Sequence, residues 1–230
     1  MKKVAFIGSY DKADMIIYIA KALTNMGKNV LVIDSTVMQK TRYIVPTMKA
    51  QKQYITTWEK IDIAIGFENI NQIKEYKNIE IDEKLEYDFV LIDIDSYRGY
   101  YYYGIKTEDK KYFVTSFDLY SLKRGLQVFK KIEKPIEVTR VLFTKEMLAD
   151  EEKYLDFLAK GLKIKWDSNV LYFPFEMGDQ NAIFSNQRSG KIQLKGLSSQ
   201  YIDGISFMTE EISGESRGNV KKAVKMIERN

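Results

Sequence analysis

Residues 3–35, KVAFIGSYDKADMIIYIAKALTNMGKNVLVIDS, decide the fold. The segment Val4–Ile7 is a short apolar run, and Gly8–Asp11 turns the chain. From Lys12 onward, apolar residues recur at the spacing of an amphipathic helix, at Met15, Ile16, Ile19, Ala20, Leu23 and Met26. Gly27 stands where this helix is expected to end, because a positive φ costs glycine nothing.

A second apolar run completes the unit. Val30–Ile33 is apolar without alternation and is followed by Asp34, which is typical of a parallel strand buried on both faces. A strand, a crossover helix and a second buried strand form a βαβ unit, and such units are right-handed almost without exception. The loop Gly8–Asp14 would then lie at the helix N-terminus, where unpaired backbone N–H groups and the helix dipole favour a bound phosphate.

The rest of the chain continues this alternation. Phe89–Asp95 is another buried-type strand that ends in an acid, and Ile61–Ile65 is predicted to be a short edge strand. Further strands are expected at 112–117, 138–143 and 170–175, and helices at 69–76, 121–132, 146–162, 197–212 and 219–229. We therefore predict a single α/β domain over residues 1–230, with a mostly parallel sheet between two layers of helices.

Composition excludes several kinds of site. The chain has 230 residues, enough for one substantial domain. It contains no Cys and no His, which excludes disulfides, thiol nucleophiles, Ser–His pairs and the usual Cys or His metal ligands. The formal net charge of +4 is too small and too evenly spread to indicate nucleic-acid binding. Chemistry is left to carboxylates, Lys, Arg, Tyr, hydroxyl groups, backbone amides or a hard cation such as Mg²⁺.

The sequence gives no sign of a membrane span. Its apolar runs are too short to cross a bilayer, and Val4–Ile7 is too short for the apolar region of a signal peptide. We therefore expect a cytoplasmic protein. The last predicted helix carries Lys221, Lys222, Lys225 and Arg229 without Trp or Phe, so at most a peripheral membrane contact is expected.

With these elements placed, the chain resembles the MinD/ParA branch of P-loop ATPases. That branch includes partition ATPases, cell-division positioning ATPases, bacterial tyrosine kinases and TadZ-like pilus-assembly proteins. The likeness covers nearly the whole chain in order, and it rests on the segments Ile19–Leu23, Gly27–Asp34, Tyr87–Asp93, Thr115–Leu122, Phe173–Pro174 and Asn181–Ala182. The resemblance implies a P-loop NTPase-like fold, a site for ATP and Mg²⁺, and a dimer or an assembly partner.

The phosphate-binding loop departs from that family. Lys12 falls at the P-loop lysine, but Asp11 replaces the glycine before it and Ala13 replaces the hydroxyl residue that would hold Mg²⁺. Ile7 occupies the region of the family's additional signature lysine, and only Gly8 remains of the glycine-rich loop. A phosphate cradle needs glycines, a lysine and a hydroxyl group on Mg²⁺. The loop therefore has the form of a degenerate Walker A motif.

The added carboxylates favour a different use of the loop. A carboxylate about 4 Å from a phosphate charge costs on the order of 1 kcal/mol in water and about 4 kcal/mol at an intermediate dielectric. Asp11 is also a good N-cap residue, and Asp11–Asp14 resembles a capping arrangement. We hypothesise that the helix caps itself and that nucleotide, if it binds, contacts Gly8, Ser9, Tyr10, Asp11, Lys12, Ala13 and Asp14.

Two acids at strand ends are the remaining candidates for chemistry. If the protein is active, the resemblance implies that Asp93 orients a Mg²⁺-bound water and that Asp34 polarises the attacking water. The alternative is a structural role, which is favoured for Asp34 because Thr36 stands where the family has a second acid. Near the expected base-binding end, Thr144 and Lys145 stand about where the family often has an Asn that reads adenine.

The stretch Tyr100, Tyr101, Tyr102 and Tyr103 is the candidate interface. If the segment is extended, its four side chains point to both faces. Tyr is enriched at binding hot spots, so the stretch could contact a second copy or an assembly partner. Packing on the protein's own surface is the alternative.

Two functions follow from the sequence. The first is a degenerate MinD/ParA-like scaffold that binds nucleotide weakly or not at all, needs no cofactor, and positions a secretion, pilus, conjugation or partition machine. The second is an ATP hydrolase that switches between monomer and ATP-bound dimer with an atypical loop. The degraded Gly8–Asp14 loop favours the first, and Asp93 leaves the second open.

Overall fold

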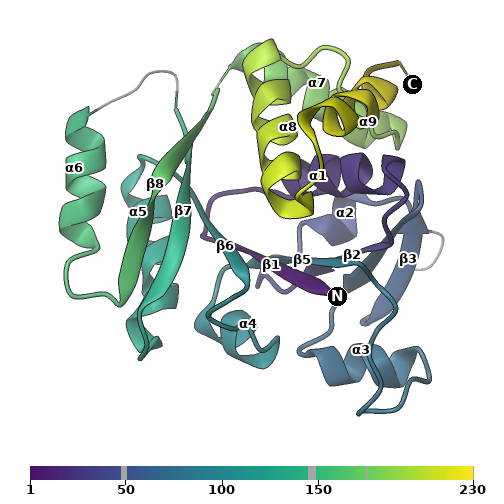
Figure 1. The fold of residues 1–230 in the computed structure, drawn as a ribbon, viewed down its shortest axis with the longest axis horizontal. Helices are drawn as coiled ribbons and strands as arrows, with labels where there is room; N and C mark the ends of the chain where they lie inside the picture. Colours follow the sequence, from purple (N-terminus) through teal and green to yellow (C-terminus); the bar gives the residue numbers. More distant parts are fainter. Residues whose placement is uncertain (48–50, 145–148, 175, 230) are drawn as a thin grey trace.

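The computed structural model describes residues 1–47, 51–144, 149–174 and 176–229 (Figure 1). Strands and helices alternate along most of the chain. The strands are β1 (Lys2–Ile7), β2 (Val30–Asp34), β3 (Tyr54–Trp58), β4 (Ile61–Ile65), β5 (Phe89–Ile94), β6 (Lys110–Ser116), β7 (Ile136–Phe143) and β8 (Ile164–Phe173). The helices are α1 (Ala13–Asn25), α2 (Thr41–Ile44), α3 (Ile70–Tyr76), α4 (Tyr97–Tyr102), α5 (Leu119–Leu126), the 3₁₀ helix η1 (Gln127–Lys131), α6 (Ala149–Leu158), α7 (Met177–Ser189), α8 (Ser199–Ser213) and α9 (Arg217–Arg229).

The strands form one sheet in the order β3-β4-β2-β5-β1-β6-β7-β8. All neighbouring pairs are parallel except β3 with β4, which is antiparallel. In the register of the central strands, Asp93 lies opposite both Phe6 and Asp34. The carboxyl ends of β1, β2 and β5 therefore meet at one edge of the sheet, which is where open α/β sheets bind ligands.

Helices cover both faces of the sheet, as predicted (Figure 1). On one face α1 packs between the sheet and helices α8 and α9. On the other face, buried side chains of α3, α4, α5 and α6 join the core, including Ile73, Tyr100, Leu126 and Leu155. Helix α1 is buried almost throughout because it lies against the sheet and is itself covered by α8 and α9. This accounts for its long apolar pattern in the sequence.

Several elements differ from the sequence-based expectation. The edge strand is β3 and not Ile61–Ile65, which lies one strand inside the sheet. The short helix α2 and the longer α7 were not predicted, because their residues are mostly polar or partly exposed and show little apolar periodicity. The predicted helix at 121–132 tightens into η1 after Leu126. Of the predicted helix at 146–162, residues 146–148 lie outside the described residues.

The four-tyrosine stretch is helical, so the expectation of an extended segment is wrong. Ser96 starts α4, where its Oγ accepts a hydrogen bond from the Gly99 N–H at 3.3 Å. Helical spacing then turns Tyr100 and Tyr103 inward, where they are 8% and 1% exposed. Two of the four predicted interface residues are therefore core residues.

The part of the chain that the structure describes contains no helix with the length and apolar character required to cross a membrane.

Candidate functional site

The loop between β1 and α1 begins at a glycine that its position requires. Gly8 has φ +143°, and a Cβ placed there would lie 2.1 Å from the carbonyl oxygen of Val114 on β6. Its N–H donates to the Ile94 carbonyl oxygen at 2.9 Å. The loop is thereby held against β5 and β6, the two strands that flank β1. It carries residues 9–12 over the edge of the sheet.

Lys12 is buried in this loop and is 3% exposed. Its ammonium group donates to the Gly8 carbonyl oxygen at 2.7 Å and lies 2.6 Å from Oδ1 of Asp93. A buried ammonium and a buried carboxylate each lose a large hydration energy, and their mutual attraction offsets that loss only when they are paired. The pairing of Lys12 with Asp93 therefore reduces the energetic cost of burying either charge.

Asp93 is the group with the most perturbed acidity in the site. Burial raises the pKa of its carboxyl to about 7, although the Lys12 ammonium favours the charged form, and the nearby Asp34 carboxylate adds to the rise. A carboxyl with a pKa this close to neutrality gives up its charge easily. Without Lys12 beside it, Asp93 would be a poor anionic ligand for a cation.

Asp34 has a structural role in the turn that follows β2. Its carboxylate accepts hydrogen bonds from the N–H and the hydroxyl of Thr36 at 3.0 and 2.6 Å, and from the Thr41 N–H at 3.0 Å. The side chain is thereby directed into its own loop and the start of α2. Asp34 thus accepts hydrogen bonds in the turn after β2 and at the first residue of α2, which favours a structural role for Asp34.

The two acids added to the loop share a second cation. Lys40, from the segment after β2, forms ion pairs with Asp11 and with Asp14, the latter at 3.1 Å. Gln187 of α7 donates to both carboxylate oxygens of Asp14 at 3.0 and 2.9 Å. Burial raises the pKa of the Asp14 carboxyl, and Lys40 and Gln187 act in the opposite direction. These contacts connect the start of α1 to two distant parts of the chain.

The predicted self-capping of α1 occurs only in part. Asp11 Oδ1 accepts from the Ala13 N–H at 3.3 Å, but the N-cap position is Lys12, which makes no side-chain cap, and Asp14 points to Lys40 and Gln187 instead. Within the described residues, the backbone N–H groups of 9–12, 14 and 15 have no hydrogen-bond acceptor. The N-terminus of the helix therefore keeps most of its free donors.

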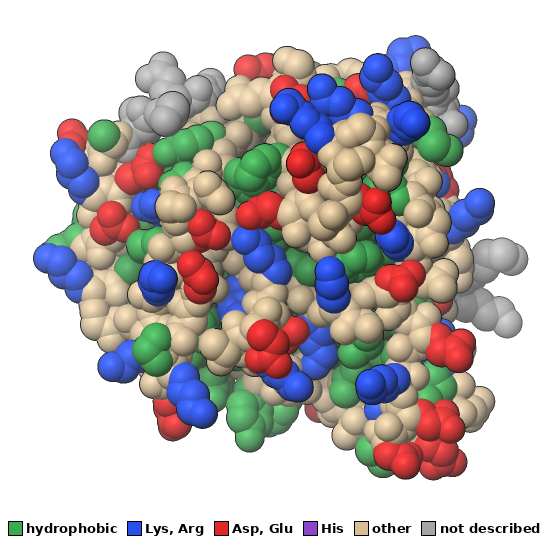
Figure 2. All heavy atoms as spheres, in the orientation of Figure 1, with side chains coloured by type: hydrophobic (Ala, Val, Ile, Leu, Met, Phe, Trp, Pro, Cys, Tyr) green, Lys and Arg blue, Asp and Glu red, His purple; other side chains and the backbone are tan. Residues whose placement is uncertain are grey.

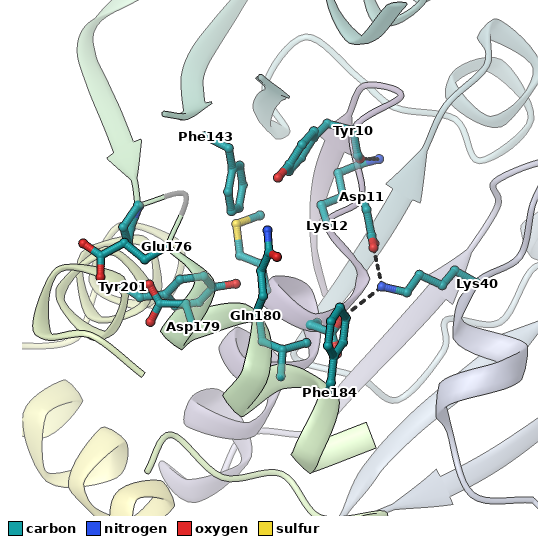
Figure 3. Close-up of a pocket in the computed structure, with 14 residues that line it drawn as sticks. Tyr10, Asp11, Lys12, Lys40, Phe143, Glu176, Asp179, Gln180, Phe184 and Tyr201 are labelled. Atoms are coloured by element: carbon teal, nitrogen blue, oxygen red, sulfur yellow. Dashed lines mark hydrogen bonds and ion pairs between the residues drawn. The ribbon is translucent and has the colours of Figure 1, made fainter. Parts of the chain in front are cut away.

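Two cavities flank the loop. The first, of about 220 Å³, lies between the loop, the ends of β7 and β8, and helices α7 and α8; its lining includes Tyr10, Phe143, Gln180, Phe184 and Tyr201 (Figure 3). The Tyr10 ring packs against Phe143 with 4.7 Å between ring centroids, and burial raises the pKa of Tyr10 to about 12. The second cavity, of about 320 Å³, lies on the other side, toward Thr36, Met38, Asp93 and Asp95.

The backbone groups that line the two cavities suit a phosphate, but the side chains do not. The free N–H groups of the loop are what an anion at a helix N-terminus requires. Of the described residues that line the cavities, the cations are Lys12 and Lys40, and both are already paired with carboxylates. Ala13 offers no hydroxyl group, and the described residues contain no group of three acids placed to hold a metal ion. The side chains of the loop therefore lack the hydroxyl ligand and the unpaired lysine with which a P-loop holds a Mg²⁺-bound triphosphate.

No protein-family model matches the sequence, and no curated protein matches it. Solved structures match over nearly the whole chain. A chain of the MinC:MinD cell division protein complex from Aquifex aeolicus is 15% identical, with a TM-score of 0.56, and the match covers 94% of this chain and 97% of that one. A ParA family ATPase from Chlorobium tepidum TLS is 16% identical, with a TM-score of 0.50 and coverage of 98% and 97%.

The chain has the fold of the MinD/ParA-type P-loop ATPases. The MinD cell division protein of Aquifex aeolicus agrees, with 16% identity, a TM-score of 0.51 and coverage of 93% of this chain and 97% of that one. At identities this low the likeness concerns the fold alone. What the site does has to be argued from its own residues.

The structure brings most of the sequence-predicted site residues together. Gly8–Asp14, Asp34 and Asp93 meet at one edge of the sheet, whereas the tyrosine stretch follows β5 and lies on α4. Sequence reasoning missed Lys40 and Gln187, which reach the loop from distant segments without any periodic or motif signal. Thr144 is described, but Lys145, the other residue expected near a base, lies outside the described residues.

Proposed function

We propose that this protein is a degenerate member of the MinD/ParA-like group that binds nucleotide weakly or not at all and acts as a scaffold. In this role it positions or assembles a larger machine, such as one for secretion, pilus formation, conjugation or partition. The fold supplies the body of the scaffold, and the altered loop removes the chemistry of an ATPase.

The observation that carries the proposal is the pairing of charges around the loop. Three carboxyl groups, Asp11, Asp14 and Asp93, surround two ammonium groups, Lys12 and Lys40, so both cations are already paired before any ligand arrives. A triphosphate would have to compete with Asp93 for Lys12 and would lie close to Asp11. Each carboxylate about 4 Å from a phosphate charge opposes binding by roughly 1–4 kcal/mol, depending on the local dielectric.

A scaffold acts through surfaces that other proteins recognise. One of the similar structures is a MinC:MinD complex, so this fold can carry a bound protein partner. For this chain we propose either a second copy or an assembly protein as the partner. A role of this kind requires a stable fold and an exposed surface, and it does not require hydrolysis.

The test is a titration with a fluorescent ATP analogue in the presence of Mg²⁺, together with a phosphate-release assay. We expect a dissociation constant weaker than about 100 μM for the wild type, and no hydrolysis above the buffer blank. The variant Asp11→Gly/Ala13→Ser removes one carboxylate and restores one hydroxyl group. It should bind at least about tenfold more tightly, because one repulsive charge is gone.

A matched control removes a carboxylate far from the loop. Glu108 precedes β6 and therefore lies at the amino end of that strand, at the opposite edge of the sheet from Gly8. The variant Glu108→Gln should bind nucleotide as weakly as the wild type. Micromolar affinity of the wild-type protein for Mg²⁺-ATP would contradict the proposal.

One observation favours the alternative, an active ATP-dependent switch that dimerises. The backbone N–H groups of residues 9–12 have no acceptor among the described residues, so part of a phosphate cradle is preserved. Asp93 also lies beside Lys12, where the resemblance implies a carboxylate that orients a Mg²⁺-bound water. The same titration separates the two functions, because the switch requires tight binding and a change in mass when ATP is added.

A further inference from the structure

Helix α4 carries an exposed group of aromatic rings. Tyr101 and Tyr102 are 64% and 49% exposed, although neighbouring Tyr100 and Tyr103 are buried. The ring centroids of Tyr97 and Tyr101 are 6.0 Å apart, and those of Tyr101 and Tyr102 are 5.6 Å apart. These rings therefore pack on one another and leave their outer faces to solvent.

Positive charges flank these rings. The Lys131 ammonium lies 5.6 Å from the centroid of the Tyr97 ring, and Arg98 is exposed on the same short helix. We call Tyr97, Tyr101, Tyr102, Arg98 and Lys131 the tyrosine patch. Tyr and Arg are the residue types most enriched at the hot spots of protein interfaces. Exposed apolar groups with a polar rim mark interaction sites on soluble proteins.

A surface of opposite charge lies on the neighbouring elements. Residues 80–86 follow α3 and contain the exposed acids Glu80, Asp82, Glu83 and Glu86 with a single lysine, Lys84. We call residues 80–86 the acidic segment. It also exposes Ile81, at 70%, and Tyr76 at the end of α3 is 47% exposed. The segment therefore combines negative charge with apolar surface.

The two surfaces belong to one side of the molecule. Helices α3 and α4 cover the same face of the sheet, and the Tyr103 hydroxyl donates to the Phe67 carbonyl oxygen, just before α3, at 2.8 Å. In Figure 1 both helices lie along the lower side. Figure 2 shows acidic side chains gathered at the lower right, in the region of α3, and hydrophobic ones at the lower edge, in the region of α4.

We propose that this side binds a second copy of the chain, with the tyrosine patch of each copy on the acidic segment of the other. Two adjacent, complementary surfaces on one side of a molecule can meet twice across a two-fold axis, which closes the dimer. Pairing the patch with itself would place Arg98 and Lys131 against their own copies, and like charges across an interface are unfavourable. Charge complementarity therefore selects the crossed arrangement.

This dimer does not use the loop at Gly8, so it needs no nucleotide. It would give a scaffold a permanent pair of identical surfaces. The nucleotide titration above tests the loop, whereas the mass of the protein without nucleotide tests this inference. Either one can fail without the other.

The experiment is sedimentation velocity on the full chain without nucleotide, over a range of protein concentrations. The wild type should sediment as two chains of 26.9 kDa at about 0.1 M salt, and association should weaken at about 1 M, where the screening length falls from about 10 to about 3 Å. The variant Tyr101→Ser/Tyr102→Ser should weaken the dimer at least about tenfold, since hot-spot residues dominate interfaces.

The matched control removes two other exposed apolar side chains. Leu119 and Tyr120, at the start of α5, are 54% and 68% exposed and lie outside both surfaces. The variant Leu119→Ser/Tyr120→Ser should dimerise like the wild type. Thermal melts of all variants check that the fold is intact, which is expected because the replaced side chains are exposed.

A charge exchange tests the crossed arrangement directly. Arg98→Glu/Lys131→Glu and Glu80→Lys/Glu83→Lys should each weaken the dimer at least about tenfold, and the four changes together should restore it. A wild type that is monomeric at every concentration overturns the proposal. So does a dimer that the tyrosine variant leaves unchanged, or a four-residue variant that fails to recover.

Discussion

The N-terminus of α1 differs from the N-termini of α3, α5 and α8. In those three helices a side chain at the N-cap accepts a backbone N–H: Asn69 from Gln72 at 3.0 Å, Asp118 from Ser121 at 2.9 Å, and Ser198 from Tyr201 at 3.2 Å. In α1 the N-cap is Lys12, without a side-chain cap. The N-cap residues of α2 and α7 also make no side-chain cap, so the open end of α1 matters for its position at the Gly8 loop and the strand ends.

At the start of α1 the backbone and the side chains have opposite properties. The backbone at the start of α1 retains the free donors of an anion site, whereas the side chains around it neutralise one another through the Lys12–Asp93 and Lys40–Asp11–Asp14 pairs. At α3, α5 and α8 a side-chain cap takes at least one of these donors. An ancestral phosphate cradle with altered side chains would have both properties. The experiments below vary one element of this contrast at a time.

The largest effect is expected from breaking the buried ion pair. Lys12→Met leaves the Asp93 carboxyl buried without the ammonium group beside it, and breaking a buried pair in this way costs about 3–5 kcal/mol of unfolding free energy. Replacing both partners, as in Lys12→Met/Asp93→Leu, should recover most of that loss, because no buried charge remains. Unfolding in urea, followed by circular dichroism, measures both variants against the wild type.

The exposed pair between Lys153 and Asp150, at 3.0 Å, supplies the control for this prediction. Exposed pairs contribute between zero and about 1 kcal/mol, so Asp150→Asn should change stability little. Equal losses for Lys12→Met and Asp150→Asn would show that burial of the pair at the loop has no energetic consequence.

The pH dependence of stability should be the next largest effect. The folded pKa of Asp93 is about 7, above the ordinary value of 3.8, so between these values the native state holds a proton that the unfolded chain has released. The contribution of Asp93 to stability is therefore most favourable below about pH 4. It falls as the pH rises to about 7, with a slope of up to about 1.4 kcal/mol per unit, and is level above that.

The variant Asp93→Asn lacks this proton, so it isolates the effect. The unfolding free energy of the wild type minus that of Asp93→Asn should fall as the pH increases from about 4 to about 7, because only the wild type loses stability through this titration. Urea unfolding at several pH values measures this difference. A difference that stays constant across that range would mean that the carboxyl is charged throughout, as in an ordinary exposed acid.

The sequence predicted the strands and the helix that position the site better than it predicted the side-chain contacts within the site. β1, α1, β2 and β5 were recognised because their apolar residues are local and follow either a helical period or an unbroken run. These elements alone bring Gly8, Asp34 and Asp93 to one edge. The strand β3 and the helix α7 were missed because their burial depends on neighbours distant in the chain, such as the bond from the Trp58 indole to the Gly190 carbonyl oxygen.

The electrostatics of the loop could not be predicted for the same reason. Asp11 and Asp14 were expected to cap α1, since both stand at the right spacing in the sequence. Lys40 and Gln187 come from other segments and hold Asp14 away from the free N–H groups. A local pattern gives the residues that could cap a helix, but only the folded chain shows which partners compete for them.

The smallest effect concerns the caps themselves and tests the opening contrast directly. Asp118→Ala removes the acceptor of the Ser121 N–H, and loss of an N-cap typically costs about 1 kcal/mol. Asp11→Ala should cost less than about 0.5 kcal/mol, because Asp11 is exposed, is not the N-cap residue and accepts from Ala13 only at 3.3 Å. Urea unfolding of the two variants measures both losses under the same conditions.

The relative stability losses of Asp11→Ala and Asp118→Ala show whether Asp11 caps α1. If Asp11→Ala costs as much as Asp118→Ala, then Asp11 is a true cap of the Ala13 N–H, and the start of α1 resembles the capped starts of α3, α5 and α8. If only Asp118→Ala is costly, the free N–H groups of residues 9–12 are structural remnants that no side chain has replaced. Under the proposed function, the charges of Asp11, Asp14 and Asp93 are then what opposes nucleotide binding, because the path of the backbone itself leaves donors available to a phosphate.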